Sequence, residues 1–274
     1  MTTNTGNRQF IDSVLRDIIQ PGTDRLMESR YFSDLRAGSL TTRRIQGFAL
    51  QHYIHNMGIL KAFALGATQH AADNRTFTAY ATAMGEELTH PNMCKTLGFS
   101  LGLTEKDFDK AVPVRGALVH TAVCIHGIFL VSVVEMRAMA LSNETMVQRY
   151  AAEFDEYLPK EPYNMSEEAR EFFIVHKGAD VEHTERAATA IAESATSDED
   201  QEKVRTMCRN MAGLKLGKFD SIYDEYRLTT AMQNALFPRV CWAYTKYQLN
   251  EMKTGDFQAG VRHKAQVTPA QPRS

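Results

Sequence analysis

Three residues with helical spacing are the strongest candidates for chemistry. Asp180 and His183 follow His176 at distances of four and seven residues. An α-helix turns by about 100° per residue, so these side chains fall within about 40° of one another. Imidazole nitrogen and carboxylate oxygen suit iron or manganese better than an all-thiolate set. The apolar run 172–175 precedes His176, which indicates a buried turn. The pattern predicts metal ligands, and the alternative is the solvated face of an amphipathic helix.

A second pair of the same kind lies earlier in the chain. Glu87 and His90 form a Glu-x-x-His pair on one helical face, and Glu86 is an alternative partner at a spacing of four. Asp180 and His183 repeat the carboxylate-x-x-His spacing. Helical bundles build sites for two iron or manganese ions from two such pairs and carboxylates of other helices.

Glu135 is the third candidate, because it follows Val133 and Val134 in the most apolar part of the chain. A buried carboxylate is costly unless it is paired or coordinated. We therefore expect Glu135 to bind metal, with an ion pair to Arg137 or to another helix as the alternative. The six expected metal ligands are Glu87, His90, Glu135, His176, Asp180 and His183. The three carboxylates of this set are also the expected catalytic groups.

Other residues that could do chemistry have simpler explanations. His52 and His55 lie one turn apart, and packing or hydrogen bonding in the core is the favoured explanation for both. On a single helix, His120 would lie on nearly the same face as Glu135 and could contact the metal ligands from behind. His126 would lie on the opposite face from Glu135. Cys124 is expected to be an inert buried thiol.

The elements that must position these residues are helical throughout, because apolar residues recur with helical periodicity along nearly the whole chain. Pro21 and Gly22 are expected to stop the first helix, and Pro91 to kink or restart another. We expect one helical domain over 1–253 and a flexible tail over 254–274. The predicted helices are 10–19, 23–35, 42–71, 74–90, 91–101, 112–142, 144–158, 166–195, 198–226 and 238–252.

Composition excludes several classes of function. The chain has 274 residues, with 31 Lys and Arg against 33 Asp and Glu, and this balance excludes a basic nucleic-acid footprint spread over the surface. Its four cysteines contain no Cys-x-x-Cys pair, so we expect free thiols and a cytoplasmic location. The start lacks a signal-peptide pattern. The apolar stretch 117–141 contains charged residues, which indicates a buried helix and not a membrane span.

The series Glu87-x-x-His90, Glu135, His176-x-x-x-Asp180-x-x-His183 resembles the haem-oxygenase-like di-iron oxidases and oxygenases. The run 90–93, His-Pro-Asn-Met, is similar to that family's segment after its first histidine ligand. The resemblance covers 42–195. It implies an all-α, haem-oxygenase-like bundle of about seven core helices plus short flanking helices. It also implies two non-haem irons, with O2 as co-substrate.

Members of this family oxidise amino-acid-like or fatty-acid substrates by N-oxygenation, desaturation or C–C cleavage. The resemblance therefore implies a small, carboxylate-bearing substrate, in a specialised biosynthetic pathway. The expected partners are that substrate, an electron donor and a second copy of the chain, without nucleic acid or membrane. Some members carry a further acid on the long early helix, but this sequence has none between Thr41 and His70.

Two other classes of function are compatible with the pattern. The first is a metal-independent hydrolase or synthase of the thiaminase-II or quinone-cofactor-synthase type, which would need an active cysteine or an ordered organic ligand. The second is a non-catalytic iron-binding protein, which would hold iron without turnover.

Overall fold

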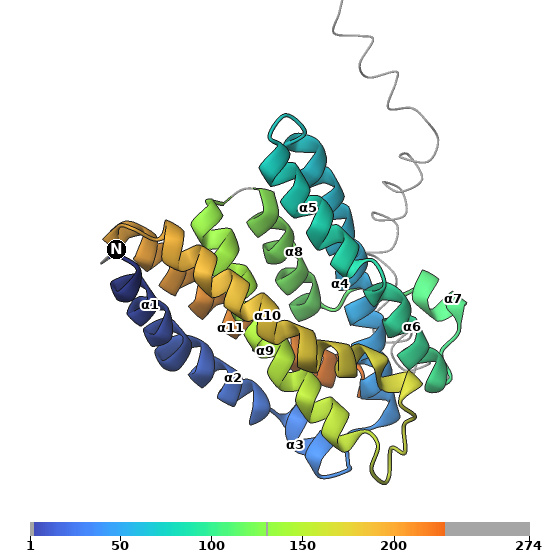
Figure 1. Ribbon diagram of the computed structural model, residues 1–274. Coiled ribbons are helices and arrows are strands. Elements are labelled where there is room, and N and C mark those ends of the chain that lie inside the picture. Colours follow the sequence, from blue (N-terminus) through green and yellow to red (C-terminus); the bar gives the residue numbers. More distant parts are fainter. Residues whose placement is uncertain (1–2, 130, 228–274) are drawn as a thin grey trace, which may run out of the picture. The chain divides into compact units, whose positions relative to one another are not determined.

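The computed structural model describes residues 3–129 and 131–227, apart from the side chains of 3–6, 75 and 179–183. Every regular element in these ranges is helical (Figure 1), which confirms the predicted class. The predicted helix 238–252 and the tail lie outside the described residues. The α-helices are α1 Thr3–Val14, α2 Gln20–Met27, α3 Arg30–Arg36, α4 Thr42–Gln69, α5 Asn74–Glu87, α6 His90–Ser100, α7 Glu105–Asp109, α8 Arg115–Phe129, α9 Val133–Tyr157, α10 Glu171–Ser194 and α11 Asp198–Glu225.

Two groups of long helices form the bundle. Helix α4 packs against α5, α6 and α8, and helix α9 packs against α10 and α11. Helix α11 also contacts α8 and α4, so it joins the two groups. Figure 1 shows α9, α10 and α11 running together through the middle of the molecule. Of the described helices, none is long and apolar enough to cross a membrane.

The predicted helix 112–142 is wrong, because the chain breaks between α8 and α9. Ser132 is the N-cap of α9, and its hydroxyl accepts a hydrogen bond from the Glu135 N–H. The Glu135 carboxylate in turn accepts hydrogen bonds from the Ser132 N–H and hydroxyl. This reciprocal capping box satisfies backbone N–H groups at the start of the helix. From there α9 continues to Tyr157 without the break predicted near Asn143.

The two prolines behave differently. The expected stop at Pro21 is wrong: the chain passes from α1 through a π-helical segment, Leu15–Ile19, into α2. Pro21 occupies the first turn of α2, where a proline is tolerated because that N–H has no partner within the helix. The predicted restart at Pro91 is confirmed, since α5 ends at Glu87 and α6 begins at His90.

Aromatic side chains from five helices form the centre of the core. Edge-to-face and stacked ring pairs join α3, α4, α9, α10 and α11, with Phe48 contacting rings on three of the other four helices. Aromatic pairs of this kind add to the stabilisation that burial provides. The rings concerned are those of Tyr31, Phe32, Phe48, Tyr150, Phe154, Phe172, Phe173 and Phe219. Through Phe48 these contacts connect α4 with Phe172 and Phe173 of α10.

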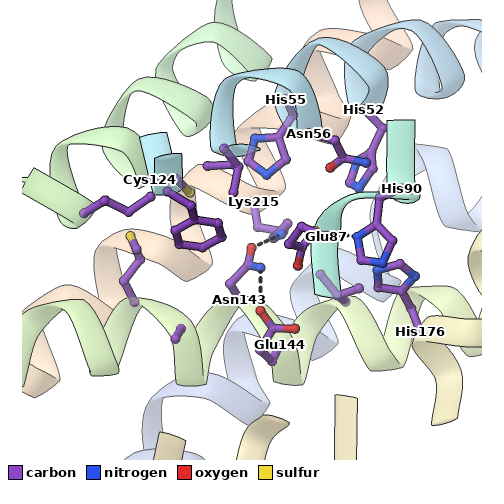
Figure 2. Close-up of a pocket in the computed structure, with 16 residues that line it drawn as sticks. His52, His55, Asn56, Glu87, His90, Cys124, Asn143, Glu144, His176 and Lys215 are labelled. Carbon is purple, nitrogen blue, oxygen red and sulfur yellow. Dashed lines mark hydrogen bonds and ion pairs between the residues drawn. The ribbon is translucent and has the colours of Figure 1, made fainter. Parts of the chain in front are cut away.

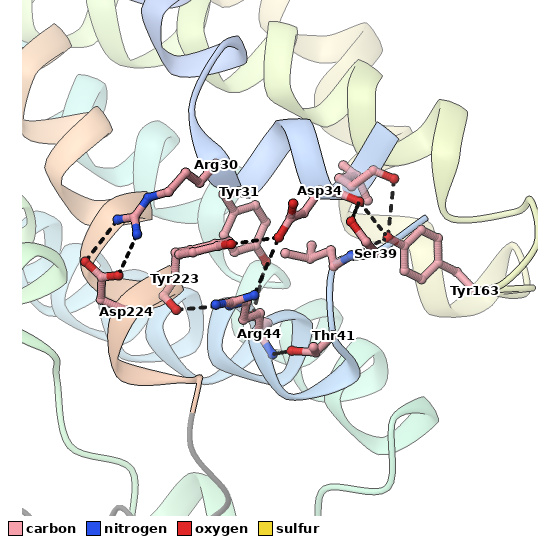
Figure 3. A network of polar contacts seen from close by, with 11 residues as sticks. Arg30, Tyr31, Asp34, Ser39, Thr41, Arg44, Tyr163, Tyr223 and Asp224 are labelled. Carbon is pink, nitrogen blue, oxygen red and sulfur yellow. Dashed lines mark hydrogen bonds and ion pairs between the residues drawn. The ribbon is translucent and has the colours of Figure 1, made fainter. Parts of the chain in front are cut away.

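A polar network fixes the end of α11 against α3 and α4 (Figure 3). The Tyr223 hydroxyl donates to Asp34 at 2.8 Å, and Arg44 donates to the Tyr223 carbonyl at 3.0 Å. The Arg44 guanidinium also lies 3.4 Å from the centre of the Tyr223 ring. Arg30 forms an ion pair with Asp224 at 3.0 Å. The network sets the axial position of α11, which carries two buried lysines.

Candidate metal centre and adjoining cavity

A cavity of about 100 Å³ lies between the two groups of helices. Figure 2 shows its polar side chains converging from α4, α5, α6, α9, α10 and α11. An apolar wall completes it. The lining residues are His52, His55, Asn56, Ile59, Phe63, Glu87, His90, Cys124, Ile128, Met139, Ala140, Asn143, Glu144, Val147, His176 and Lys215.

His176 is held in a defined orientation at the edge of the aromatic core. Its ring is buried and stacks on Phe172 with the ring centres 4.0 Å apart. Nδ1 donates a hydrogen bond of 2.6 Å to the Phe172 carbonyl oxygen. In the neutral ring the lone pair is therefore on Nε2. Metal-binding histidines are commonly oriented by such a bond from the other ring nitrogen.

Glu87 and His90 are brought together as their spacing predicts. The Glu87 carboxylate contacts Nδ1 of His90, and both side chains line the cavity. The His90 ring centre is 4.3 Å from that of His176. Glu86, the alternative, forms an ion pair with Arg186 and is not among the lining residues. The structure thus brings both members of the first predicted pair, together with His176, to the same cavity.

Glu135 does not line the cavity, so its predicted place beside the other ligands is wrong. Its carboxylate is engaged at the start of α9, and the Ser132 hydrogen bonds lower its pKa. The carboxylate that α9 presents to the cavity is Glu144. The sequence contains the signal that distinguishes them, because Ser132-x-x-Glu135 is the capping-box pattern. Glu144 follows within the same helix, two and a half turns further on.

The remaining two predicted ligands, Asp180 and His183, lie on α10 together with His176. Their side chains are outside the described residues. The helix runs without interruption from Glu171 to Ser194, as the spacing argument requires.

His52 and His55 line the cavity and are also hydrogen-bonded. Nδ1 of His52 lies 2.9 Å from Nζ of Lys218, and Nδ1 of His55 lies 2.9 Å from the Thr121 hydroxyl. Burial lowers the pKa of both imidazoles, and the nearby lysines lower it further. Both rings are therefore neutral at pH 7. The hydrogen-bonding explanation is confirmed, and both rings in addition shape the cavity.

Metal-capable atoms of His55, His120 and Cys124 also lie within 4.8 Å of one another. Burial lowers the pKa of His120, and the neighbouring Lys215 and Lys218 lower it further. The same two lysines lower the pKa of His55. The cluster offers no carboxylate oxygen, unlike the donors gathered around Glu87 and Glu144 in the cavity. His126 is exposed and is not among the lining residues. The prediction that it lies on the far side of a helix from Glu135 is wrong, because α8 and α9 are separate helices and His126 acts on the pKa of Glu135.

Comparison with known proteins decides the family. Residues 46–216 match the family described as iron-containing redox enzymes. The chain belongs to this family. The matched residues include the whole cavity, from His52 on α4 to Lys215 on α11. No curated protein matches the chain.

Solved structures confirm the haem-oxygenase-like fold. A domain of unknown function with this fold from Shewanella denitrificans is 18% identical, with a TM-score of 0.67 over 77% of this chain and 90% of that one. A TenA homologue from P. horikoshii is 16% identical, with a TM-score of 0.65 over 78% and 98%. A TenA homologue from Pseudomonas syringae is 14% identical, with a TM-score of 0.65 over 78% and 92%. Similarity at this level of identity establishes the fold alone.

The donor set of the cavity fits iron. Glu87 and Glu144 supply carboxylate oxygens, and His90 and His176 supply imidazole nitrogens. Mixed oxygen and nitrogen donors without thiolate suit non-haem iron. The hydrogen bond between His176 and Phe172 orients one of these imidazoles in advance. The residues present therefore match the metal that the family description names.

Proposed function

We propose that this protein is a non-haem di-iron enzyme that uses O2 to oxidise a small substrate. The observation that carries the proposal is the convergence of Glu87, His90, Glu144 and His176 on one cavity in a member of an iron-containing redox family. Asp180 and His183, on the same helix as His176, complete a set of six donors for two ions. Glu144 takes the role that the sequence assigned to Glu135.

The protein's part in such a reaction is to hold the ions and shape the cavity. Bound iron supplies O2 activation and one-electron redox chemistry. His176 and His90 are held by hydrogen bonds at Nδ1, which leaves Nε2 as the donor atom of each neutral ring. Glu87 contacts His90, so both groups can serve one ion. Ile59, Phe63 and Ile128 form an apolar wall that limits the water beside the reacting groups.

The reaction class proposed is N-oxygenation, desaturation or C–C cleavage, acting on an amino-acid-like or carboxylate-bearing molecule. An electron donor and a homodimer belong to the same proposal. These finer features rest on the resemblance of the ligand series to the haem-oxygenase-like di-iron enzymes.

A metal-independent hydrolase is the second candidate, because TenA homologues share the fold and Cys124 lines the cavity. A cysteine nucleophile reacts as its thiolate. Burial raises the pKa of Cys124 to about 11, so the thiol stays protonated at neutral pH. This property favours the iron enzyme over the hydrolase.

O2 uptake tests the proposal. The chain loaded anaerobically with Fe(II) is mixed with buffered O2 in an oxygen electrode, with free Fe(II) at the same concentration as a blank. We expect uptake above the blank, its loss in His176→Ala, and its retention in Cys124→Ser. Uptake no greater than the blank for the loaded native chain would contradict an O2-activating role.

A further inference from the structure

A second cluster of metal-capable side chains is formed by residues other than the proposed iron ligands. His55 belongs to α4, and His120 and Cys124 belong to α8. His120 and Cys124 are four residues apart, so they share one face of their helix. One ligand-capable atom of each of the three residues lies within 4.8 Å of the other two. All three residues are buried, and His55 and Cys124 line the cavity (Figure 2).

Helices α4 and α8 approach each other closely at this cluster. A methyl group on Gly58 of α4 would lie 3.3 Å from Cγ2 of Thr121 on α8. The ring centres of His55 and His120 are 5.0 Å apart. Nδ1 of His55 lies 2.9 Å from the Thr121 hydroxyl, which leaves Nε2 as the atom available to a metal. Metal-binding histidines are commonly held by such a bond at the other ring nitrogen.

The His120 side chain has polar atoms that packing does not explain. Its ring is fully buried, and neither ring nitrogen has a hydrogen-bond partner among the described residues. A buried polar group without a partner costs free energy of folding, and an apolar residue of similar size would avoid that cost. A bound ion would give one of these nitrogens a partner. The unpaired ring therefore points to a ligand at this cluster.

The donors of the cluster differ in kind from those of the proposed iron centre. The cluster offers two imidazole nitrogens and one sulfur, and no carboxylate oxygen. Thiolate selects soft ions such as Cu(I) and Zn(II), and imidazole binds both. Glu87 and Glu144 supply carboxylate oxygens elsewhere in the cavity, and such donors suit harder ions. The two sets of donors therefore favour different metals.

Charge and ligand number distinguish the two soft ions. Burial lowers the pKa of His55 and His120, so both rings bind as neutral ligands, and Cys124 binds as the thiolate. One thiolate balances the charge of Cu(I), whereas Zn(II) would leave a positive charge in a buried site, which is costly. Lys215 and Lys218 act on the pKa of all three residues, and an uncharged complex avoids their repulsion. Zn(II) also prefers four ligands.

We propose that His55, His120 and Cys124 bind one Cu(I) ion at a site separate from the iron centre. The ion reaches the site from the cavity, which His55 and Cys124 line. On binding, the Cys124 thiol releases its proton to solvent, and the copper–sulfur bond takes its place. The site requires neither iron nor O2, so the inference does not depend on the proposed function.

Anaerobic competition for Cu(I) tests the site. The full-length, iron-free protein is titrated with Cu(I) in the presence of a colorimetric Cu(I) chelator, and X-ray absorption of the loaded protein identifies the ligands. We expect one tightly bound ion per chain with one sulfur and two nitrogen ligands. Equimolar Zn(II) is expected to leave this ion in place. Displacement of Cu(I) by Zn(II), or a spectrum with sulfur ligands alone, would overturn the inference.

Two variants each remove one ligand. Cys124→Ser and His120→Leu are each expected to weaken Cu(I) binding about tenfold or more, since even residues that only orient a ligand change metal affinity by about 10- to 100-fold. His120→Leu keeps the thiol, so it separates this site from copper bound by a cysteine alone. Cys208→Ser is the matched control, because Cys208 is a buried cysteine that is not among the lining residues. It is expected to keep the native affinity.

The iron ligands provide the remaining control. His176→Ala lacks a proposed iron ligand and is expected to bind Cu(I) as tightly as the native chain. Native Cu(I) affinity in folded His120→Leu would overturn the inference. Loss of Cu(I) binding in His176→Ala with native affinity in Cys124→Ser would place the copper in the iron centre, and would overturn it equally. Circular dichroism of each variant establishes that its helices are intact.

Discussion

Ser132 and Glu135 cap each other at the start of α9, with the Ser132 hydroxyl donating to the Glu135 carboxylate at 2.7 Å. The apolar sequence around Glu135 predicted a buried metal ligand, but in the structure its carboxylate binds Ser132 instead. The same helix presents Glu144 to the cavity. The two glutamates therefore have separable roles, one in the stability of the helix and the other in the proposed centre.

Glutamine substitutions distinguish these roles. Glu144→Gln removes a proposed carboxylate ligand and is expected to lower the iron content by about one ion per chain, as expected for loss of one ligand of a two-ion site. Glu135→Gln is expected to keep its iron and to lose about 0.5–1 kcal/mol of unfolding free energy, since it weakens the cap. Iron analysis and urea unfolding measure the two effects. The reverse pattern would restore Glu135 as the ligand.

The cysteines test the competing hydrolase. Cys124→Ser is expected to retain O2 uptake, because burial raises the pKa of this thiol and the proposed reaction does not use it. Cys208→Ser is the matched control, a buried cysteine with its pKa raised to about 12 that does not line the cavity. A large loss of turnover in Cys124→Ser alone, with stability equal to that of the control, would favour cysteine chemistry.

His120 predicts a dependence of stability on pH. It is 0% exposed, and neither ring nitrogen has a hydrogen-bond partner among the described residues. Burial lowers its pKa, so the unfolded chain binds a proton there that the folded chain excludes. The unfolding free energy therefore falls as the pH drops below the ordinary histidine pKa of about 6.5. For one such histidine the fall between about pH 7.5 and pH 5.5 is about 1.4 kcal/mol.

His120→Leu removes this contribution. The variant is expected to be more stable than the native chain, with a larger difference in unfolding free energy at about pH 5.5 than at about pH 7.5. The reason is that only the native chain loses unfolding free energy when its unfolded form binds a proton at His120. Urea unfolding of both proteins at the two pH values measures the margin. Carboxylates respond to pH equally in both proteins and cancel. An identical margin at both pH values would show that folding leaves the pKa of His120 unchanged and would contradict the prediction.

Two glycines test how closely α8 packs against α11. A methyl group on Gly116 of α8 would overlap the Gly217 carbonyl and the Ser221 hydroxyl of α11, whereas one on Gly213 of α11 would meet nothing within 4 Å. Gly116→Ala is expected to cost about 1–3 kcal/mol of unfolding free energy. Gly213→Ala is expected to gain about 0.5–1 kcal/mol. Equal thermal stability of the two variants would contradict close packing of α8 on α11.

Local spacing in the sequence predicted much of this molecule. Helical periodicity gave the fold class, and the Glu87–His90 pair was found because residues three or four apart share a helical face. Of the stripe on α10, His176 lines the cavity. Glu144 was missed because its importance depends on which face of α9 meets α10, which is a tertiary property. Lys215 was missed for a similar reason: it lies on a different helix from the metal ligands, and sequence spacing does not connect the two.

The break before Ser132 was hidden by the apolar composition on both sides of it. Residues 123–134 are mostly apolar on both sides of Ser132, so only the capping-box pattern marks the new helix. At Pro21 the sequence predicted a break that the structure does not contain. Proline ends many helices, but here it lies in the first turn of α2.

The iron content of the anaerobically loaded chain tests the central claim most directly. Full-length protein is loaded with excess Fe(II) under anaerobic conditions, desalted and analysed for iron, and a second sample is mixed with O2 and followed by visible absorption. Six donors for two ions predict about two irons per chain and a transient visible band on O2 exposure. His176→Ala is expected to lose at least one iron and the band. Native protein that retains no more iron than His176→Ala, and shows no band, would contradict a di-iron centre in this cavity.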